Sequence, residues 1–228
     1  MSSSASLGRP AIATIYDDKP AGYFSNARHD IIALLKTNGD AAILELGCGS
    51  GGTGRAAIAA GKANRYVGLE LNETAGKIAA ESLSEVIIGD VQTLDLSAYE
   101  NQFDALIISE VLEHLTDPWT TLERLVRCVR IGGEIYASSP NISYWKIIAR
   151  LISGRFEYQA SGMMDQTHLR WFTPKSFRRL FQSAGVEIQF LRPMRKPGWK
   201  AGIVSTLTAG RLDHLFIAQM FVRGYRSR

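Results

Sequence analysis

A short stretch in the middle of the chain combines two carboxylates with a histidine. It reads SEVLEHL from Ser109 and places Glu110, Glu113 and His114 at positions i, i+3 and i+4. If a helical turn begins there, the three side chains share one face. A second histidine, His168, lies far along the chain in the sequence DQTHLRWF. Carboxylate oxygens and imidazoles together suit Mg²⁺ or Mn²⁺, so we predict a metal site made of Glu110, Glu113, His114 and His168.

The same residues allow two other interpretations. Without an ion, His114 or His168 is a candidate general base, and we include Glu110 with the two histidines as candidate catalytic residues. Glu113 and His114 could also simply cap and pair at a helix start, with His168 as an ordinary loop residue. The spacing leaves these alternatives open.

A glycine-rich string precedes this stretch and reads ELGCGSGG from Glu45. Gly47, Gly49 and Gly52 satisfy the pattern GxGxxG, in which glycines let a ligand approach the backbone beside a helix N-terminus. Glu70 ends the next predicted strand, where an acid can accept hydrogen bonds from both hydroxyls of a ribose. Both features also suit an NAD-dependent dehydrogenase.

Two acids favour a different nucleoside cofactor. Glu45 precedes the glycines, at a place where a carboxylate could hold an ammonium group rather than a pyrophosphate. Asp90 follows a third predicted strand in the sequence Gly-Asp-Val and is placed to meet the edge of an adenine.

Helical and extended patterns alternate from about residue 25 onward, and the strands are apolar runs. This alternation predicts a parallel sheet with helices on both faces. The predicted helices are 26–36, 53–60, 74–82, 119–129 and 174–184, and the predicted strands are 41–47, 65–71, 86–88, 103–108, 133–138, 186–191 and 214–222.

We expect residues 1–228 to form a single domain with two additions. One is an N-terminal helical segment, about 1–38, and the other is an insertion, about 141–172, that forms a lid or acceptor-binding region. The insertion contains ISYWKIIARLIS, an apolar stretch that carries Lys146 and Arg150. This stretch could be a lid, an ordinary half-buried helix, or an amphipathic surface that touches a membrane.

The ordered set of motifs resembles the class I S-adenosylmethionine-dependent methyltransferases. The set comprises the glycine string, Glu70, Gly89-Asp90, FDALIISEVLEHL and LVRCVRIGGEIYASSPN. The resemblance implies a Rossmann-like sheet of seven strands in the order 3-2-1-4-5-7-6, with strand 7 antiparallel. It also implies S-adenosyl-L-methionine as cofactor, bound by Glu45, Gly47, Cys48, Gly49, Gly51, Glu70, Leu71, Asp90, Val91 and Ser109.

The pattern E-x-x-E-H with a distant histidine resembles metal-dependent O-methyltransferases, including ubiquinone-pathway enzymes. The tract from GRFEY to DQTHLRWFT resembles methyltransferases of glycan and cell-surface polysaccharide pathways. We therefore expect an O-methyltransferase that acts on a hydroxyl of a small or glycan-like acceptor. The alternatives are a ubiquinone-type phenol or an RNA 2′-O-methyltransferase, and the dehydrogenase is a weaker one.

Composition and charge limit the remaining possibilities for the class of protein and its partners. The chain has 228 residues, of which 46% are hydrophobic, so it is an ordinary globular protein rather than a disordered or fibrous one. Its net charge is +4, but the basic residues gather after residue 173, where only Glu187 and Asp213 are acidic. This asymmetry hints at an anionic partner such as a membrane surface. The sequence shows no module of interleaved aromatic and basic residues of the kind that binds RNA, so we do not expect nucleic acid as a partner. The oligomeric state stays open.

Two features bear on location. The opening residues MSSSASLG lack the basic and apolar regions of a secretory signal. Cys48 and Cys128 are too few for a disulfide framework. We expect a cytoplasmic protein and leave open a peripheral contact with the inner face of the membrane.

Overall fold

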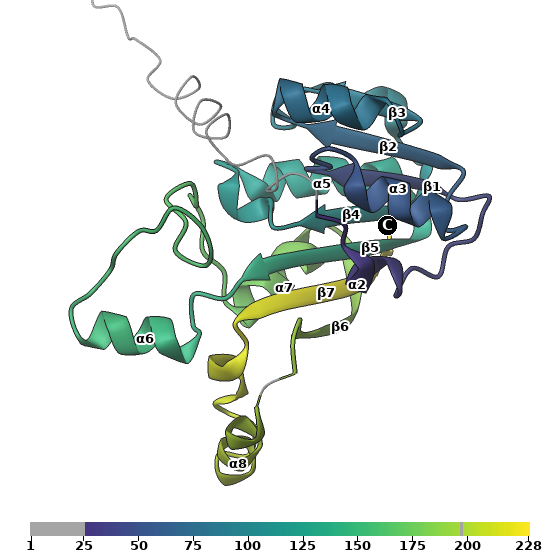
Figure 1. The fold of residues 1–228 in the computed structure, drawn as a ribbon. Coiled ribbons are helices and arrows are strands. Elements are labelled where there is room, and N and C mark those ends of the chain that lie inside the picture. Colours follow the sequence, from purple (N-terminus) through teal and green to yellow (C-terminus); the bar gives the residue numbers. More distant parts are fainter. Residues whose placement is uncertain (1–25, 197) are drawn as a thin grey trace, which may run out of the picture. The chain divides into compact units, whose positions relative to one another are not determined.

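The structure is a computed structural model that describes residues 26–196 and 198–228. The chain divides into two compact units, with the boundary between Leu94 and Asp95. Most of the predicted N-terminal helical segment falls in residues 1–25, outside the described part. The strand order is β3-β2-β1-β4-β5-β7-β6, which confirms the predicted order (Figure 1).

The first unit carries three parallel strands. β1 pairs with β2, and β2 pairs with β3, each in parallel register. Most residues of these strands are apolar, and the charged ones lie at or next to the strand ends. Helices that follow β1 and β2 pack against the strands. Its elements are α2 (His29–Ile32), β1 (Ala42–Leu46), α3 (Gly52–Ala59), β2 (Arg65–Glu70), α4 (Glu73–Ala80) and β3 (Glu85–Ile88).

The second unit carries the other four strands. β4 and β5 are parallel, whereas β7 runs antiparallel to both β5 and β6. The strand and helix bounds are β4 (Phe103–Ser109), α5 (Pro118–Cys128), β5 (Val129–Pro140), α6 (Trp145–Ile152), α7 (Pro174–Ser183), β6 (Val186–Pro193), α8 (Trp199–Leu207) and β7 (Gln219–Arg226), with 3₁₀ turns at Ser97–Tyr99, Leu112–His114 and Asp213–Phe216.

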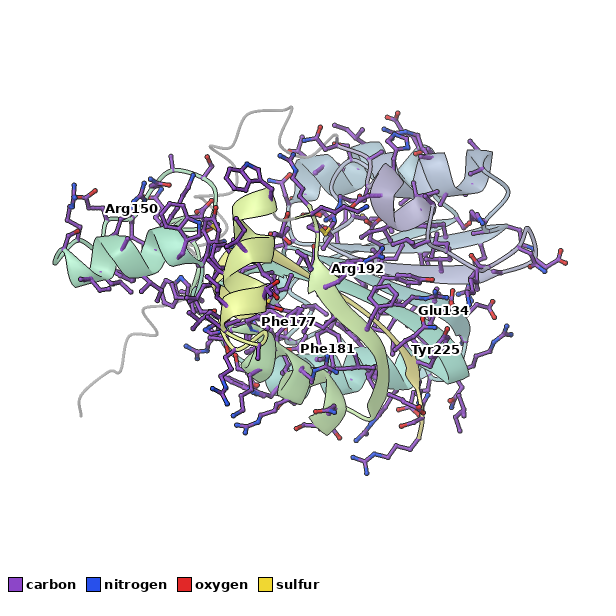
Figure 2. All side chains as sticks on the ribbon, turned by 90° about the horizontal axis from the view of Figure 1, so that it is seen from below. Glu134, Arg150, Phe177, Phe181, Arg192 and Tyr225 are labelled. Carbon is purple, nitrogen blue, oxygen red and sulfur yellow. The ribbon has the colours of Figure 1, made fainter. Side chains whose placement is uncertain are left out.

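Local sequence explains where the covering helices of this unit begin. The Asp117 carboxylate accepts from two backbone amides at the start of α5, and Thr173 and Ser176 form a reciprocal capping box at the start of α7. α7 packs against β6. Phe177 and Phe181, which are labelled on α7 in Figure 2, are fully buried.

The structure differs from the predicted elements most clearly in three places. The first helix is shorter than predicted, since α2 ends at Ile32. The last strand begins at Gln219 rather than His214, because residues 213–216 form a 3₁₀ turn whose carbonyl at His214 is bound by Asn141. α8 was not predicted, since its apolar side chains face solvent and its sequence shows no clear helical periodicity.

A buried ion pair joins β5 to β7 within the second unit. The Arg223 guanidinium donates to the Glu134 carboxylate, and both side chains are less than a tenth exposed. The Tyr136 hydroxyl donates to the other carboxylate oxygen of Glu134 at 2.8 Å. The Arg223 guanidinium also lies 5.5 Å from the centre of the Tyr136 ring. Each charge therefore has partners in the place of water.

We predict that removing one partner of this pair is costly. The substitution Glu134→Ala leaves the Arg223 charge buried, so it should lower the free energy of unfolding by about 3–5 kcal/mol. The double variant Glu134→Leu/Arg223→Met removes both charges and should recover most of that loss. The control Glu85→Ala breaks an exposed pair with Arg65 and should cost less than about 1 kcal/mol. Urea unfolding followed by circular dichroism measures all three, and equal losses for Glu134→Ala and Glu85→Ala would contradict the prediction.

Candidate functional site

The glycine loop of the first unit joins β1 to α3. Gly47, Gly49 and Gly51 all have positive φ, between 53° and 79°, a conformation that side-chain-bearing residues rarely adopt. Gly51 is the N-cap of α3 and has no side-chain oxygen to cap it. The loop therefore presents bare backbone at a helix N-terminus, as a bound ligand requires.

Glu45 lies at the end of β1, directly before this loop. It is buried, and its carboxylate accepts a 2.9 Å hydrogen bond from the hydroxyl of buried Tyr66. Burial raises the pKa of the Glu45 carboxyl to about 7, although hydrogen bonds from Tyr66 and Thr53 oppose the rise. Near neutral pH the Glu45 side chain therefore exists both as the acid and as the anion. The ammonium group of a ligand beside it would stabilise the anion.

Glu70 ends β2 and is tied to the glycine loop. One carboxylate oxygen accepts from the amide of Gly49 at 2.8 Å, and the other accepts from the amide of Asn72 at 2.8 Å. Burial raises the pKa of Glu70, and the backbone hydrogen bonds oppose the rise. Each oxygen keeps a second lone pair, so the carboxylate can hold the loop and still accept from a ligand.

The remaining predicted cofactor residues follow the same strand ends. Cys48 and Val91 are buried, whereas Leu71 is more exposed. Asp90 follows β3 and accepts from the amide of Gln92 at 2.9 Å. Ser109 belongs to the second unit, where its hydroxyl lies 3.3 Å from that of Ser138. Because parallel strands end at one edge of a sheet, the loops after β1, β2 and β3 meet at the same edge.

In the second unit, Glu113 lies in the 3₁₀ turn that follows β4. Its side chain is buried, and one carboxylate oxygen accepts from the Ser139 hydroxyl, on β5, at 3.1 Å. The other oxygen, Oε1, is buried and has no hydrogen-bond partner among the described residues. Burial and the nearby Glu110 carboxylate raise the pKa of Glu113 well above its usual range. A buried acceptor of this kind calls for a proton or a cation.

The insertion brings His168 to this carboxylate. The backbone amides of Leu169 and Arg170 both donate to the carbonyl oxygen of Glu113, at 2.8 and 2.9 Å. The rings of His114 and His168 then lie 4.7 Å apart, centre to centre. One ligand atom each from Glu113, His114 and His168 falls within 4.8 Å of the others. We call these three residues the Glu-His-His cluster.

Hydrogen bonds to carbonyl groups orient both imidazoles. Nδ1 of His114 lies 3.2 Å from the carbonyl oxygen of Thr167, and Nδ1 of His168 lies 3.3 Å from that of Met163. In the tautomer in which each Nδ1–H donates to its carbonyl oxygen, Nε2 carries the lone pair. This is how ligating histidines are commonly held.

Glu110 differs from the predicted arrangement. The 3₁₀ turn begins at Leu112, and Glu110 precedes it with a left-handed backbone, φ 56°. Its amide donates to the carbonyl oxygen of Ser138, which fixes the backbone against β5. Glu110 therefore does not share a helical face with Glu113 and His114, and the cluster contains three of the four predicted ligands.

Three supporting residues escaped the sequence analysis. Ser139 donates to Glu113, and Thr167 approaches His114 through both its carbonyl and its hydroxyl. Asp165 accepts from the amide and the hydroxyl of Thr167, which fixes that residue in place. The adjoining DQTH sequence was the one available signal for Asp165 and Thr167, and nothing marked Ser139.

Comparisons with known proteins identify methyltransferases as relatives of this chain. Residues 44–135 match a family described as a methyltransferase domain. A ubiquinone biosynthesis O-methyltransferase of Aromatoleum aromaticum is 25% identical over 150 residues, which are 64% of this chain and 63% of that protein. The corresponding enzyme of Thiobacillus denitrificans is 26% identical, over 67% of each chain. The matched region thus spans about two thirds of the length of these relatives.

Solved structures share the fold. A Haloferax volcanii methyltransferase, solved with the activator Trm112, has a TM-score of 0.66 and 16% identity, over 97% of this chain and all of that one. An S-adenosylmethionine-dependent methyltransferase from Mesorhizobium loti has a TM-score of 0.61 and 17% identity, over 92% and 99%. Strand order, glycine loop and family match together set aside the dehydrogenase alternative. The chain has the fold of the class I S-adenosylmethionine-dependent methyltransferases, and residues 44–135 match a methyltransferase-domain family.

Proposed function

We propose that this chain transfers the methyl group of S-adenosylmethionine to a hydroxyl of an acceptor that carries two neighbouring hydroxyls. The observation that supports this most is the Glu-His-His cluster, which lies at the carboxyl ends of β4 and β5, where ligands bind in open α/β sheets. The family supplies the methyl donor. The cluster supplies groups that can bind and deprotonate an acceptor oxygen.

The residues of the chain would divide this work between them. Glu45 would hold the ammonium group of the donor, Glu70 its ribose, and Asp90 its adenine. Methyl transfer is an in-line displacement, so most of the acceleration comes from alignment of donor and acceptor. The remaining requirement is removal of the hydroxyl proton, for which Nε2 of His114 or His168 offers a lone pair.

The cluster also fits a divalent ion. Glu113 Oε1 is a buried oxygen without a hydrogen-bond partner among the described residues, and the two imidazoles present Nε2 lone pairs near it. Glu113, His114 and His168 would hold Mg²⁺ or Mn²⁺, and Glu110 stays a candidate fourth ligand. A bound ion would lower the pKa of a coordinated hydroxyl.

The acceptor class follows from this chemistry and from the relatives. Neighbouring hydroxyls can occupy adjacent open positions of one ion, as both catechols and sugar diols could. The ubiquinone biosynthesis enzymes among the relatives favour a phenolic acceptor. The cell-surface glycan acceptor expected from the sequence stays the second candidate, and an RNA 2′-hydroxyl the third. Assays with 3,4-dihydroxybenzoate, methyl mannoside and a short RNA, scored by release of S-adenosylhomocysteine, separate the three.

We predict that Glu70→Ala weakens S-adenosylmethionine binding by roughly 10- to 100-fold, because it removes a charged acceptor of hydrogen bonds. The matched control is Glu73→Ala, which changes an exposed glutamate three residues away that pairs with Lys77. Isothermal titration calorimetry measures both. Equal affinities for the two variants would contradict the assigned role of Glu70.

The pKa of Glu45 predicts a pH dependence of the same binding. The ionised carboxylate attracts the donor's ammonium group, so affinity should be retained above pH 7 and lost as pH falls through about 7. A pKa near 7 implies a loss of about fivefold between pH 7 and pH 6. In Glu45→Gln this dependence should disappear. A wild-type affinity that is constant between pH 7 and pH 6 would argue against a Glu45–ammonium contact.

We predict that the Glu-His-His cluster acts on the acceptor and not on the donor. His114→Ala and His168→Ala should each lower kcat about 100-fold or more, while donor affinity changes less than about twofold. His214→Ala is the control, because this histidine lies on the turn before β7. If EDTA abolishes wild-type activity and Mn²⁺ restores it, an ion is required. Full activity in EDTA would leave the histidines as general bases, and full activity of both variants would refute either role.

A further inference from the structure

Two long connecting segments, which we call excursions, leave the strands of the second unit at the same end. The first, residues 142–171, follows β5, and the second, residues 194–218, connects β6 to β7. Asn141, at the root of the first, is fully buried and donates to the carbonyl oxygens of His214 and Ile217, at 2.8 and 2.7 Å. Both excursions therefore meet at the carboxyl end of β5. Asn141 lies two residues beyond Ser139, which is the hydrogen-bond partner of Glu113.

Each excursion carries a helix that leaves apolar side chains in solvent. α6 buries Ile147, but Trp145 and Leu151 are exposed and Ile152 is 83% exposed. Figure 1 shows α6 and α8 standing away from the strands of this unit, and Figure 2 labels Arg150 on α6.

α8 repeats this arrangement on the second excursion. Trp199 is 74% exposed, Leu207 is 79% exposed, and Ile203 is half exposed. Two helices rooted at the same residue thus each present a tryptophan and bulky aliphatic side chains. The loop after α6 adds the exposed rings of Phe156 and Tyr158, which lie 5.4 Å apart.

Both excursions also carry exposed basic side chains. On the first excursion Lys146, Arg150 and Arg155 are exposed, and the ammonium group of Lys146 lies 5.8 Å from the centre of the Trp145 ring. On the second, Arg195, Lys196 and Arg211 are exposed. The exposed acids of both excursions are fewer, namely Glu157 and Asp213.

We propose that α6, residues 153–158 and α8 form a surface that docks on an anionic phospholipid bilayer. We call it the docking surface. Tryptophan and aliphatic side chains would enter the boundary between headgroups and acyl chains, while lysine and arginine would meet lipid phosphates. None of the described helices is long and apolar enough to cross a membrane, so the contact is peripheral. It would bring the Glu-His-His cluster to the lipid surface and so give access to acceptors held in the membrane.

The composition of the docking surface favours lipid over a protein partner. Amphipathic helices at membranes combine lysine and arginine with tryptophan and aliphatic residues, and the basic side chains are complementary in charge to lipid phosphates. Association with a second copy of the chain would set these like charges against one another. A second copy is therefore the competing outcome of the test.

The test is sedimentation of the full chain with phospholipid vesicles, which requires no acceptor and no cofactor. We expect binding to phosphatidylcholine vesicles that contain about 30% phosphatidylglycerol at low salt. The bound fraction should fall about tenfold on pure phosphatidylcholine, and similarly when roughly 0.5 M salt shortens the screening length. Equal binding to both vesicle types, or no binding to either, would overturn the proposal.

Point variants locate the contact. Ile152→Asp and Leu207→Asp replace exposed side chains, and each should weaken vesicle binding about tenfold. The matched control is Ile131→Asp, because Ile131 is also exposed but lies near the amino end of β5. Unchanged binding of both test variants would refute the docking surface. So would concentration-dependent dimers, seen by sedimentation velocity, that Ile152→Asp dissociates while no vesicle binding occurs. Methyl transfer to a water-soluble acceptor is measured separately, so this proposal can fail while the proposed function stands.

Discussion

The Glu-His-His cluster depends on two backbone hydrogen bonds to one carbonyl oxygen. The amides of Leu169 and Arg170 bind the carbonyl of Glu113, and this contact helps to place an insertion residue, His168, beside His114. The side chains around it are then fixed in turn, since Asp165 holds Thr167 and Thr167 lies against His114. Glu113 and His114 are adjacent in one 3₁₀ turn, so the contact is what adds His168, the third member of the cluster.

Burial gives the same group its chemistry. The carboxyl of Glu113 has lost most of its contact with water and lies near Glu110 and Asp165, so its pKa is raised. Such a group is unfavourable as a bare anion and favourable as a cation ligand. On the donor side Glu45 follows the same logic, because its buried carboxyl lies where an ammonium group would replace lost hydration. In the proposed function, a ligand would complete the environment of a buried acid on both the donor side and the acceptor side.

The individual strands and most cluster residues could be predicted from local signals, whereas the strand order was predicted only through the resemblance of the motif set to a known family. Apolar runs mark buried parallel strands, and E-x-x-E-H marks a ligand pattern. The prediction that Glu110 and Glu113 share a helical face was wrong. It assumed a regular helix, and residue spacing does not reveal that Glu110 adopts a left-handed backbone conformation. Ser139 could not be found because its role exists only once β5 lies beside β4. α8 escaped prediction because its exposed apolar side chains give no amphipathic pattern toward the protein.

We propose that Glu113, His114 and His168 together hold one divalent ion. Diffraction from crystals soaked in Mn²⁺ and S-adenosylhomocysteine, recorded where manganese scatters anomalously, tests it most directly. We expect one anomalous peak within about 2.0–2.3 Å of Glu113 Oε1 and of Nε2 in both histidines. A peak bound elsewhere, or no peak at this cluster in crystals that bind S-adenosylhomocysteine, would contradict it.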